Sequence, residues 1–397
     1  MFEGRHRDEE TRPRVLRGER NWWFLGPGNG VAKLYPWHVD HDGAPTAETI
    51  QWLGSQGLLK PPTRKNYSLT VLTTTHCNLG CSYCFQNLGQ DESGGTAPPR
   101  IAYTRLSSAT IKKIIGFTRD RMAEAGLSGL CVTLFGGEPL LNPRGCAELL
   151  EAAAPLGLRY ADMISNGTLL NSVPLKRLSE LGLRGIQITL DGDQPDHDAT
   201  RVKRTGGGTF DDIVRNIREV QDETEIVFSL RVNVTAENLP GIDRLIERLA
   251  ERLTTARCGI YFKIVGDVGI GYHNDVSASE RLLRQFIDWN RSALARGFRV
   301  GRPREVVPCP ACSFTGGRYG AVVSADGSLS SCWETAGKPE WQVGTVFDGY
   351  QPDDIAAPRW TTCEEDFLNF ADTDSWNRFH DAVDAALLDD LAALGRL

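Results

Sequence analysis

The 397-residue sequence lacks any apolar run approaching the roughly 20 residues that span a bilayer. Its first residues, MFEGRHRDEETRPR, are charged throughout and lack the apolar segment of a secretory signal. Positive charge is not in excess either, because the net charge is −7. These absences predict a cytoplasmic protein that spans no membrane and has no general attraction to nucleic acid or anionic lipid, although they leave room for a local basic patch.

The composition that is present is ordinary for a globular protein, with 41% hydrophobic and 24% charged residues. A chain of this length exceeds what one core usually supports. We therefore predict three parts: a tail and small lobe over residues 1–66, a catalytic core over 67–300 and a cysteine-rich region over 301–397. The ten cysteines favour metal ligation over disulfides in a reducing compartment, and seven of them fall into two groups.

The first group is Cys77, Cys81 and Cys84, within the stretch TTTHCNLGCSYCFQN. A closed zinc or iron-sulfur site needs four protein ligands, so three thiolates leave one metal position open for a ligand that is not protein. Two alternatives remain at this point, a structural zinc loop with His76 as the fourth ligand and three thiols packed in a core. Cysteines clustered this tightly in a loop are rarely there for packing alone.

The segment CNLGCSYC resembles the signature of the radical S-adenosylmethionine (SAM) enzymes. The resemblance implies that the three cysteines hold a 4Fe-4S cluster whose fourth iron binds the amino and carboxylate groups of SAM. It also implies that an electron from an external donor, such as a flavodoxin or a ferredoxin, cleaves SAM to methionine and a 5′-deoxyadenosyl radical that abstracts hydrogen from the substrate. In that family the aromatic residue before the last cysteine, here Tyr83, lies beside the adenine.

Strand-like and helical segments alternate from residue 67 to about residue 265, which predicts an α/β fold with a parallel sheet. The six strand candidates are Leu69–Thr74, Leu130–Phe135, Arg159–Ile164, Gly185–Leu190, Ile226–Val232 and Gly259–Val265. Six such units match the incomplete parallel (βα)6 TIM-like barrel of the resembled family. In parallel barrels the active site lies at the carboxyl ends of the strands, and Cys77 follows the first strand at that end.

Helices are expected between these strands. The clearest has apolar residues at helical spacing from 111 to 122, with Ser107 or Ser108 as its cap. After a run of three glycines, Thr209 is expected to cap another helix, and residues 278–296 predict a further one.

The second and third strand candidates end in motifs of the resembled family. Gly136, Gly137 and Glu138 resemble its GGEP motif, in which backbone groups and the acid hold the SAM amino group; an ordinary turn is the alternative. Glycines permit a close backbone approach, and an acid beside an ammonium forms a charge-assisted hydrogen bond. Ser165 and Asn166 resemble its SNGT segment, which contacts the ribose and carboxylate of SAM.

The next two strand candidates also end in family-like segments. Asp191 resembles the acid of an LDG motif near ribose or substrate, and Arg201, in HDATR, resembles a partner of the SAM carboxylate. Arg231 and Asn233 are similar to an RxNVT segment, and strand alternation places both on one face. A barrel-facing arginine needs an anionic partner, either SAM or a structural carboxylate.

The polar loop of residues 263–275 follows the sixth strand candidate and has no assigned motif. Asp267, Tyr272, His273 and Asp275 could face substrate, any of them as general base, although most residues of such loops are simply solvated.

The second cysteine group is Cys309, Cys312, Cys332 and Cys363. Four thiolates complete a closed metal site, and a hairpin turning at Asp326-Gly327 separates the second thiolate from the third. The spacing resembles the opening half of the SPASM extension of peptide-modifying radical SAM enzymes, but the later C-x2-C-x5-C-x3-C run is missing. This implies one auxiliary iron-sulfur cluster, in a shorter "twitch" arrangement and expected to be 4Fe-4S, with zinc as the alternative.

The chain outside these motifs is expected to be structural. Residues 22–24, 31–35 and 47–56 predict two short strands and a helix, which form either a cap or a lobe that holds a precursor peptide by adding it as a strand. Cys131, Cys146 and Cys258 are expected to pack as small hydrophobes, and residues 376–394 as a helix.

The combined interpretation is a radical SAM oxidoreductase that matures a ribosomally made precursor peptide by an oxidative intramolecular crosslink. The oxidation argument is that a substrate radical must lose an electron to become a stable product, and a closed second cluster could accept it. One alternative is the same chemistry on a small molecule or protein side chain, as in sulfatase maturases. Another is a non-enzymatic electron carrier or zinc-stapled binding protein.

Overall fold

The computed structural model describes residues 13–61, 63–89, 97–266, 270, 272–304, 312–360 and 373–397. Three residues singled out in the sequence, Asp267, Cys309 and Cys363, lie outside these ranges, so their roles stay predictions. No helix of the described residues is both long and apolar enough to cross a membrane.

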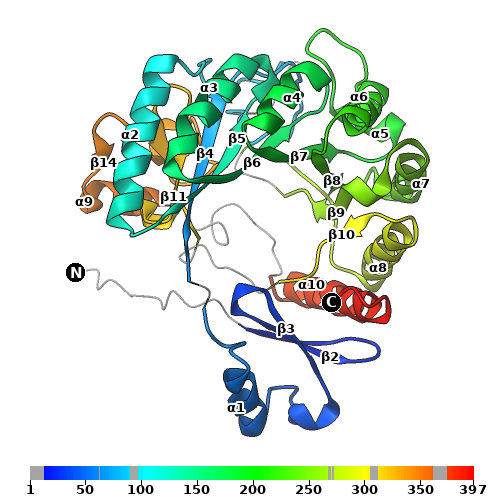
Figure 1. Ribbon diagram of the computed structural model, residues 1–397. Helices are drawn as coiled ribbons and strands as arrows, with labels where there is room; N and C mark the ends of the chain where they lie inside the picture. The colour runs from blue at the N-terminus through cyan, green and yellow to red at the C-terminus, as the bar shows by residue number, and fades with distance from the viewer. Residues whose placement is uncertain are drawn as a thin grey trace.

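The centre of the fold is a run of six parallel strands in sequential order, which confirms the predicted barrel (Figure 1). These strands are β4 (Asn66–Thr74), β5 (Gly129–Gly136), β6 (Leu158–Ser165), β7 (Leu183–Leu190), β8 (Val227–Val234) and β9 (Cys258–Ile264). The helices that surround them are α2 (Ser108–Glu124), α3 (Pro143–Ala153), α4 (Ser172–Glu180), α5 (Gln194–Thr200), α6 (Phe210–Glu223), α7 (Ile242–Arg252) and α8 (Glu280–Ala295). Figure 1 shows these helices on the outer side of the curved sheet.

Strand alternation decides which side chains face the helices and which face the barrel interior. On β8, Leu230, Val232 and Val234 are fully buried in the main hydrophobic core, whereas Arg231 and Asn233 alternate with them in sequence and point the other way. The interior of the barrel is therefore polar at the carboxyl ends of the strands, where the candidate site residues gather.

The sheet continues beyond both ends of the six-stranded run. Strand β10 (Arg299–Val300) adds in parallel to β9, and β11 (Gly320–Val323) adds in parallel to β4. Strands β12 (Ser328–Ser330), β13 (Gln342–Thr345) and β14 (Gly349–Tyr350) follow β11 in antiparallel order, and the short helix α9 (Asp353–Ala356) comes next. The cysteine-rich region is thus joined to the first barrel strand by backbone hydrogen bonds.

The predicted hairpin of the cysteine-rich region is confirmed. Strands β11 and β12 pair antiparallel and turn at Asp326-Gly327, where Gly327 has a φ of +93°. The Asp326 carboxylate accepts a hydrogen bond from the backbone N–H of Ser328 at 2.9 Å. A residue with a positive φ and an aspartate bonding two residues ahead are standard turn chemistry.

The N-terminal lobe has one strand more than the sequence suggested. Strands β1 (Arg14–Arg17), β2 (Trp22–Gly26) and β3 (Gly30–Leu34) form an antiparallel sheet, followed by α1 (Ala47–Ser55). Strand β1 was missed because it is short and both of its end residues are arginines. One sheet face packs on α1, and the other packs on the C-terminal helix α10 (Thr373–Ala393).

A buried carboxylate ties this lobe to the C-terminal helix. Asp389 of α10 is only 2% exposed. It accepts hydrogen bonds from Trp23 Nε1 at 3.0 Å, Asn21 Nδ2 at 2.7 Å and the Arg20 backbone N–H at 2.8 Å. Helix α10 also packs on α8, so the two ends of the chain form one unit beside the barrel (Figure 1).

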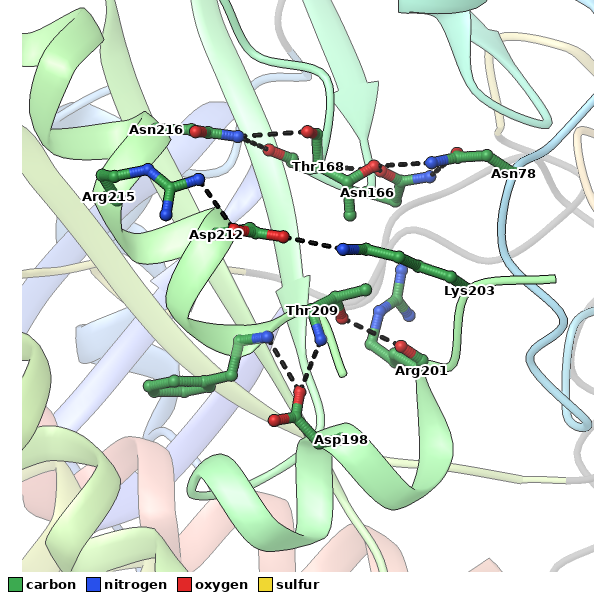
Figure 2. Close-up of polar contacts among 12 residues, drawn as sticks. Asn78, Asn166, Thr168, Asp198, Arg201, Lys203, Thr209, Asp212, Arg215 and Asn216 are labelled. Carbon is green, nitrogen blue, oxygen red and sulfur yellow. Dashed lines mark hydrogen bonds and ion pairs between the residues drawn. The ribbon is translucent and has the colours of Figure 1, made fainter. Parts of the chain in front are cut away.

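Two helix caps were predicted, and the structure confirms one of them but has a different residue in the other. Ser107 caps α2 by accepting a hydrogen bond from the Thr110 N–H at 3.1 Å, as expected. Thr209 occupies the N-cap position of α6, but its side chain does not cap the helix. Instead Asp198 Oδ1 accepts from the backbone N–H groups of Thr209 and Phe210 at 2.6 and 2.9 Å, as Figure 2 shows. A charged acceptor beside a helix N-terminus replaces the hydroxyl.

The cysteines outside the two groups agree with a structural role. Cys146 and Cys258 are fully buried in the main core, and Cys131 is partly buried on β5. Every cysteine in the described part of the chain is free.

Candidate active site

The loop that follows β4 carries the first cysteine group. Cys81 is 8% exposed, and burial raises its pKa to about 12. Burial also raises the pKa of Cys77, against the opposing effect of Arg100. The charges of Cys77 and Cys84 each raise the pKa of Cys81, so the three sulfurs lie within electrostatic range of one another. Cys77 and Cys81 therefore resist ionisation unless a cation is bound, which fits residues that ligate metal.

The spacing of the thiols does not favour the zinc alternative. In a tetrahedral zinc site, sulfur ligands lie about 3.8 Å apart. Among the described residues, only the exposed Asp40, His41 and Asp42 bring three potential ligand atoms of Cys, His, Asp or Glu within 4.8 Å of one another. The ring of His76 instead stacks on Tyr103, with centroids 3.9 Å apart.

Two N–H donors lie beside the cysteine sulfurs. Arg100 Nη1 is 3.6 Å from Cys84 Sγ, and Asn166 Nδ2 is 3.7 Å from Cys77 Sγ. Donors of this kind stabilise negative charge on thiolate ligands and tune the reduction potential of a bound cluster. Sequence reasoning found Asn166 but missed Arg100.

Gln86 connects the cysteine loop to the end of β5. Its Oε1 accepts from Arg100 Nη2 at 2.8 Å, and its Nε2 donates to the Gly136 carbonyl at 3.0 Å. The available signal was its position two residues after the third cysteine. Arg100 had no such signal, because it lies 16 residues beyond Cys84.

The two glycines of the GGEP motif let the end of β5 pack against the start of the cysteine loop. A Cβ on Gly136 would lie 2.1 Å from the Thr74 carbonyl oxygen, and one on Gly137 would lie 2.2 Å from that of His76. The N–H of Gly137 donates to the Thr74 carbonyl at 2.9 Å, and that of Glu138 donates to the His76 carbonyl at 2.8 Å. The close backbone approach expected of these glycines is therefore present, and it is to the cysteine loop.

Glu138, Ser165 and Asn166 form one buried contact, although they come from different strand ends. The Glu138 carboxylate has no solvent exposure and accepts from Ser165 Oγ at 3.0 and 3.1 Å and from the Asn166 N–H at 2.7 Å. Burial raises its pKa, while these hydrogen bonds lower it. The carboxylate already holds β5 and β6 together, and its contact with a SAM amino group stays a prediction.

Tyr83 is the centre of a polar network that joins the remaining predicted residues. Its hydroxyl donates to Asp191 Oδ2 at 2.6 Å. It accepts from Arg201 Nη1 at 2.7 Å and from Asn233 Nδ2 at 3.1 Å. Arg231 Nε donates to Asn233 Oδ1 at 2.9 Å, which confirms that these two residues share a face. Residues from the cysteine loop and from the ends of β7, α5 and β8 therefore meet at one place.

Two buried atoms of this network have no hydrogen-bond partner among the described residues: Asp191 Oδ1 and Arg201 Nε. Unsatisfied buried polar atoms are rare and call for a ligand or another explanation. An acceptor for a hydroxyl and a donor for a carboxylate fit the ribose and amino-acid parts of SAM. The residues present therefore suit the cofactor that the motifs imply.

The buried ring of His197 supports two members of this network, Asp191 and Arg201. Burial and the charge of Arg201 hold its pKa well below the usual range, so the ring is neutral. Its Nδ1 accepts from the Asp191 N–H at 3.3 Å, so Nε2 donates to Thr209 Oγ1 at 3.0 Å, and that hydroxyl donates to the Arg201 carbonyl at 2.9 Å. The sequence showed His197 within HDATR but gave it no role.

Asparagine side chains lock the cysteine loop onto the end of β6, as Figure 2 shows. Asn78 Nδ2 donates to Thr168 Oγ1 and accepts at Oδ1 from Asn166 Nδ2, both at 2.8 Å. Asn216 Nδ2 of α6 donates to the Gly167 and Thr168 carbonyls at 3.2 and 3.1 Å. None of these contacts is apparent from spacing alone.

The described candidates for a general base have different surroundings in the structure. The ring of Tyr272 meets that of Tyr83 edge to face, with centroids 5.7 Å apart. Burial, with the charges of Glu237 and Asp191, raises its pKa to about 12, so Tyr272 is protonated at neutral pH and suited to donate. Asp275 pairs with His273 at 2.7 Å, and both side chains are more than three-quarters exposed.

Two residues of the second cysteine group are described. Cys332 is 8% exposed and follows β12, and Cys312 is partly buried. The rings of their neighbours Phe314 and Trp333 lie 6.1 Å apart, so the two cysteine segments are adjacent. The full ligand set of four stays a prediction.

Residues 71–249, which contain the three-cysteine loop, match the radical SAM superfamily and form a radical SAM domain within the barrel.

Several known proteins are similar to the chain. Fe-coproporphyrin III synthase of Methanosarcina barkeri is 28% identical over 235 residues, which cover 59% of this chain and 53% of that protein. Sporulation killing factor maturation protein SkfB of Bacillus subtilis is 26% identical over 204 residues, covering 49% and 44%. PqqA peptide cyclase of Rhizobium meliloti is 28% identical over 186 residues, covering 46% and 44%. The chain thus spans about half the length of these relatives.

A solved structure shares the fold over most of the chain. Native anSMEcpe with bound AdoMet and Cp18Cys peptide superimposes with a TM-score of 0.61 at 16% identity, covering 83% of this chain and 99% of that one. At this identity the similarity shows the fold.

Proposed function

We propose that this protein is a radical SAM peptide maturase that makes an oxidative intramolecular crosslink in a precursor peptide. Cys77, Cys81 and Cys84 would hold the 4Fe-4S cluster. When bound, the cluster and SAM would supply a 5′-deoxyadenosyl radical that removes hydrogen from a peptide side chain. The observation that carries the proposal is the network at Tyr83, where residues from several strand ends leave two buried polar atoms for a ligand.

The protein's own residues would bind and orient SAM at this site. Tyr83 would lie beside the adenine, Asp191 would accept from the ribose and Arg201 would pair with the carboxylate. Gly136 to Glu138, with Ser165 and Asn166, would contact the amino-acid part. In support, Gly137 and Glu138 donate backbone hydrogen bonds to the start of the cysteine loop, and the Asn166 side chain contacts Cys77 and Asn78. A flavodoxin or ferredoxin would deliver the electron.

The oxidative part of the proposal depends on the second cysteine group. Cys309, Cys312, Cys332 and Cys363 would hold one auxiliary cluster closed to SAM, in the shorter twitch-like arrangement. The pairing of β11 with β4 supports a fixed position for this group next to the barrel. A centre that SAM cannot reach could accept the electron that the substrate radical loses.

A peptide substrate is supported by two relatives whose names describe peptide maturation and peptide cyclisation. The N-terminal lobe supplies a place for it. Strand β3 pairs only with β2 among the described strands, so its other edge can add a strand. Beside this edge, Tyr35 and Trp37 stack with centroids 4.7 Å apart and are 46% and 69% exposed. We propose that the leader of the precursor docks here, in the cytoplasm.

A small-molecule substrate is the alternative, and the similarity to Fe-coproporphyrin III synthase favours it. That relative covers the largest share of this chain among the three described above, and its name describes work on a tetrapyrrole.

The test is coexpression with short peptides encoded beside the gene, followed by mass spectrometry. The proposal expects loss of two hydrogens from a peptide with the wild-type protein and no change with Cys77→Ala. Production of 5′-deoxyadenosine without modification of any neighbouring peptide, together with conversion of a tetrapyrrole, would favour the alternative.

A further inference from the structure

Two cationic side chains that take no part in the proposed SAM site line the barrel interior. On β9, Phe262 packs outward against Trp289 of α8, with ring centroids 5.4 Å apart, and Ile264 is buried in the main core. Lys263 lies between them and must point the opposite way, into the barrel. Arg231 of β8 points into the barrel for the same reason, because its neighbours Leu230 and Val232 are core residues.

Strand register places these cations beside the Tyr83 network. Lys263 is paired with Asn233 across β8 and β9, and Arg231 is paired with Tyr261. Neighbouring strands are about 4.8 Å apart. Asn233 donates to the Tyr83 hydroxyl at 3.1 Å, so Lys263 lies one strand away from the site where the radical would form.

The side chain of Lys263 is exposed, yet its surroundings disfavour the charged form of its amine. Solvent reaches its side chain, yet burial lowers the pKa of its ammonium, and the charge of Arg231 lowers it further. Both conditions hold for a side chain whose stem is covered by its neighbours while its end reaches solvent. Within the described ranges, its ammonium forms no hydrogen bond or ion pair.

The charged side chains near Lys263 in the described part of the chain leave an excess of positive charge. Glu334, from the segment after β12, is the acid that acts on both Lys263 and Arg231. Asp191 also acts on Arg231, but it is already engaged by Tyr83 and Arg201. His380 of α10 lies within electrostatic range of Lys263, but burial lowers its pKa to about 4, so it is neutral. Among the described residues, the three cations Lys263, Arg231 and Arg201 therefore share two carboxylates.

We propose that Lys263 and Arg231 form a subsite that binds a carboxylate of the peptide substrate. The subsite rests on the proposed function and names a feature of its substrate: an acidic side chain, or the peptide's C-terminus, close to the residue that is modified. The ammonium of Lys263 and the guanidinium of Arg231 gain a charge-assisted partner in this way. The position of the subsite on β8 and β9 leaves the cysteine-loop side of the barrel to SAM.

The experiment uses the holoprotein and a peptide that the wild type modifies. Each acidic residue of the peptide is changed to its amide, and the C-terminus is amidated in a separate peptide. The protein variants are Lys263→Met, Lys263→Arg and Lys263→Glu, with Lys113→Met on the outer helix α2 as the matched control. The readouts are kcat/KM, peptide affinity by fluorescence anisotropy and SAM affinity by equilibrium dialysis.

We expect Lys263→Met to lower kcat/KM by about tenfold or more for the acidic peptide, a loss worth one charge-assisted hydrogen bond. For one of the amide peptides, Lys263→Met should cause no further loss of kcat/KM. The position of the amide in that peptide identifies the bound carboxylate as a side chain or as the C-terminus. Lys263→Arg should keep most of the activity. Lys263→Glu should prefer a peptide in which that acid is replaced by lysine.

Equal losses for the acidic and amide peptides would overturn the subsite. So would a loss of SAM affinity as large as the loss of peptide affinity, because the anion would then be the SAM carboxylate. Loss of activity in Lys263→Arg with normal peptide affinity would make Lys263 a proton acceptor instead. If the wild type modifies no peptide at all, the proposed function fails first.

Discussion

Replacing Arg100 with methionine should make the cluster in the first cysteine group harder to reduce. Arg100 Nη1 lies 3.6 Å from Cys84 Sγ, and its Nη2 is held by Gln86 at 2.8 Å. Reduction adds one negative charge to a cluster, and a fixed cation with an N–H aimed at a ligand sulfur stabilises that charge. Methionine keeps comparable bulk but removes both effects.

The size of the effect follows from the distance. Two unit charges about 4 Å apart interact by about 4 kcal/mol at an effective dielectric constant of about 20. The added electron is shared over a whole cluster and Arg100 is partly exposed, so we expect about a quarter to a half of this, or about 1 to 2 kcal/mol. For a one-electron couple, that corresponds to a midpoint potential lower by about 40 to 85 mV.

The assay is a redox titration of the reconstituted protein, followed by electron paramagnetic resonance. Iron content, measured in parallel, shows that the cluster is loaded. Arg100→Lys should lower the potential less than Arg100→Met does, because lysine restores the charge but not the two N–H contacts of the guanidinium with Cys84 and Gln86. Arg119→Met, on the exposed side of α2, is the matched control and should not move the potential. An unchanged potential in fully loaded Arg100→Met would refute the reasoning.

Three further predictions concern other parts of the molecule. Asp389→Ala should destabilise the protein by about 2 to 4 kcal/mol, because three donors, one of them the buried Trp23 Nε1, lose their acceptor, whereas Asp390→Ala on the rim should cost far less; thermal unfolding measures both. Gly137→Ala should lower iron incorporation sharply, because its Cβ would lie 2.2 Å from the His76 carbonyl oxygen, whereas Gly116→Ala, with open space around it, should load normally. Changing the four cysteines of the second group to alanine should leave uncoupled formation of 5′-deoxyadenosine without modified peptide; full product from that variant would remove the argument for an electron acceptor.

The strands of the barrel could be predicted closely because their side chains repeat every second residue and are buried by helices on one side. All six candidates overlap the observed strands, with ends shifted by three residues or fewer. The sheet of the N-terminal lobe was harder, since β1 has only four residues and two of them, Arg14 and Arg17, are charged. Its stability comes from packing on α10, which lies at the other end of the chain.

The candidate site was predictable where a residue belongs to a motif at a strand end. Tyr83, Asp191, Arg201 and Asn233 were named separately, and their hydrogen bonds show that they belong together. Arg100 acts through a contact that depends on how the chain after the cysteines folds back, which no local pattern specifies. The same holds for Asp198, which took the capping role expected of Thr209, because a charged acceptor outcompetes a hydroxyl at a helix N-terminus.

Strand β4 is hydrogen-bonded to β5 on one side and to β11 on the other. The position of the hairpin before Cys332 relative to the first cysteine group is thus set by a ladder of main-chain bonds, not by the chain that connects them. An engineer could lengthen or cut the connection after residue 300 and still expect the two halves to find the same alignment. A split version of the protein, reassembled through that pairing, would be a practical way to load the two proposed metal centres independently.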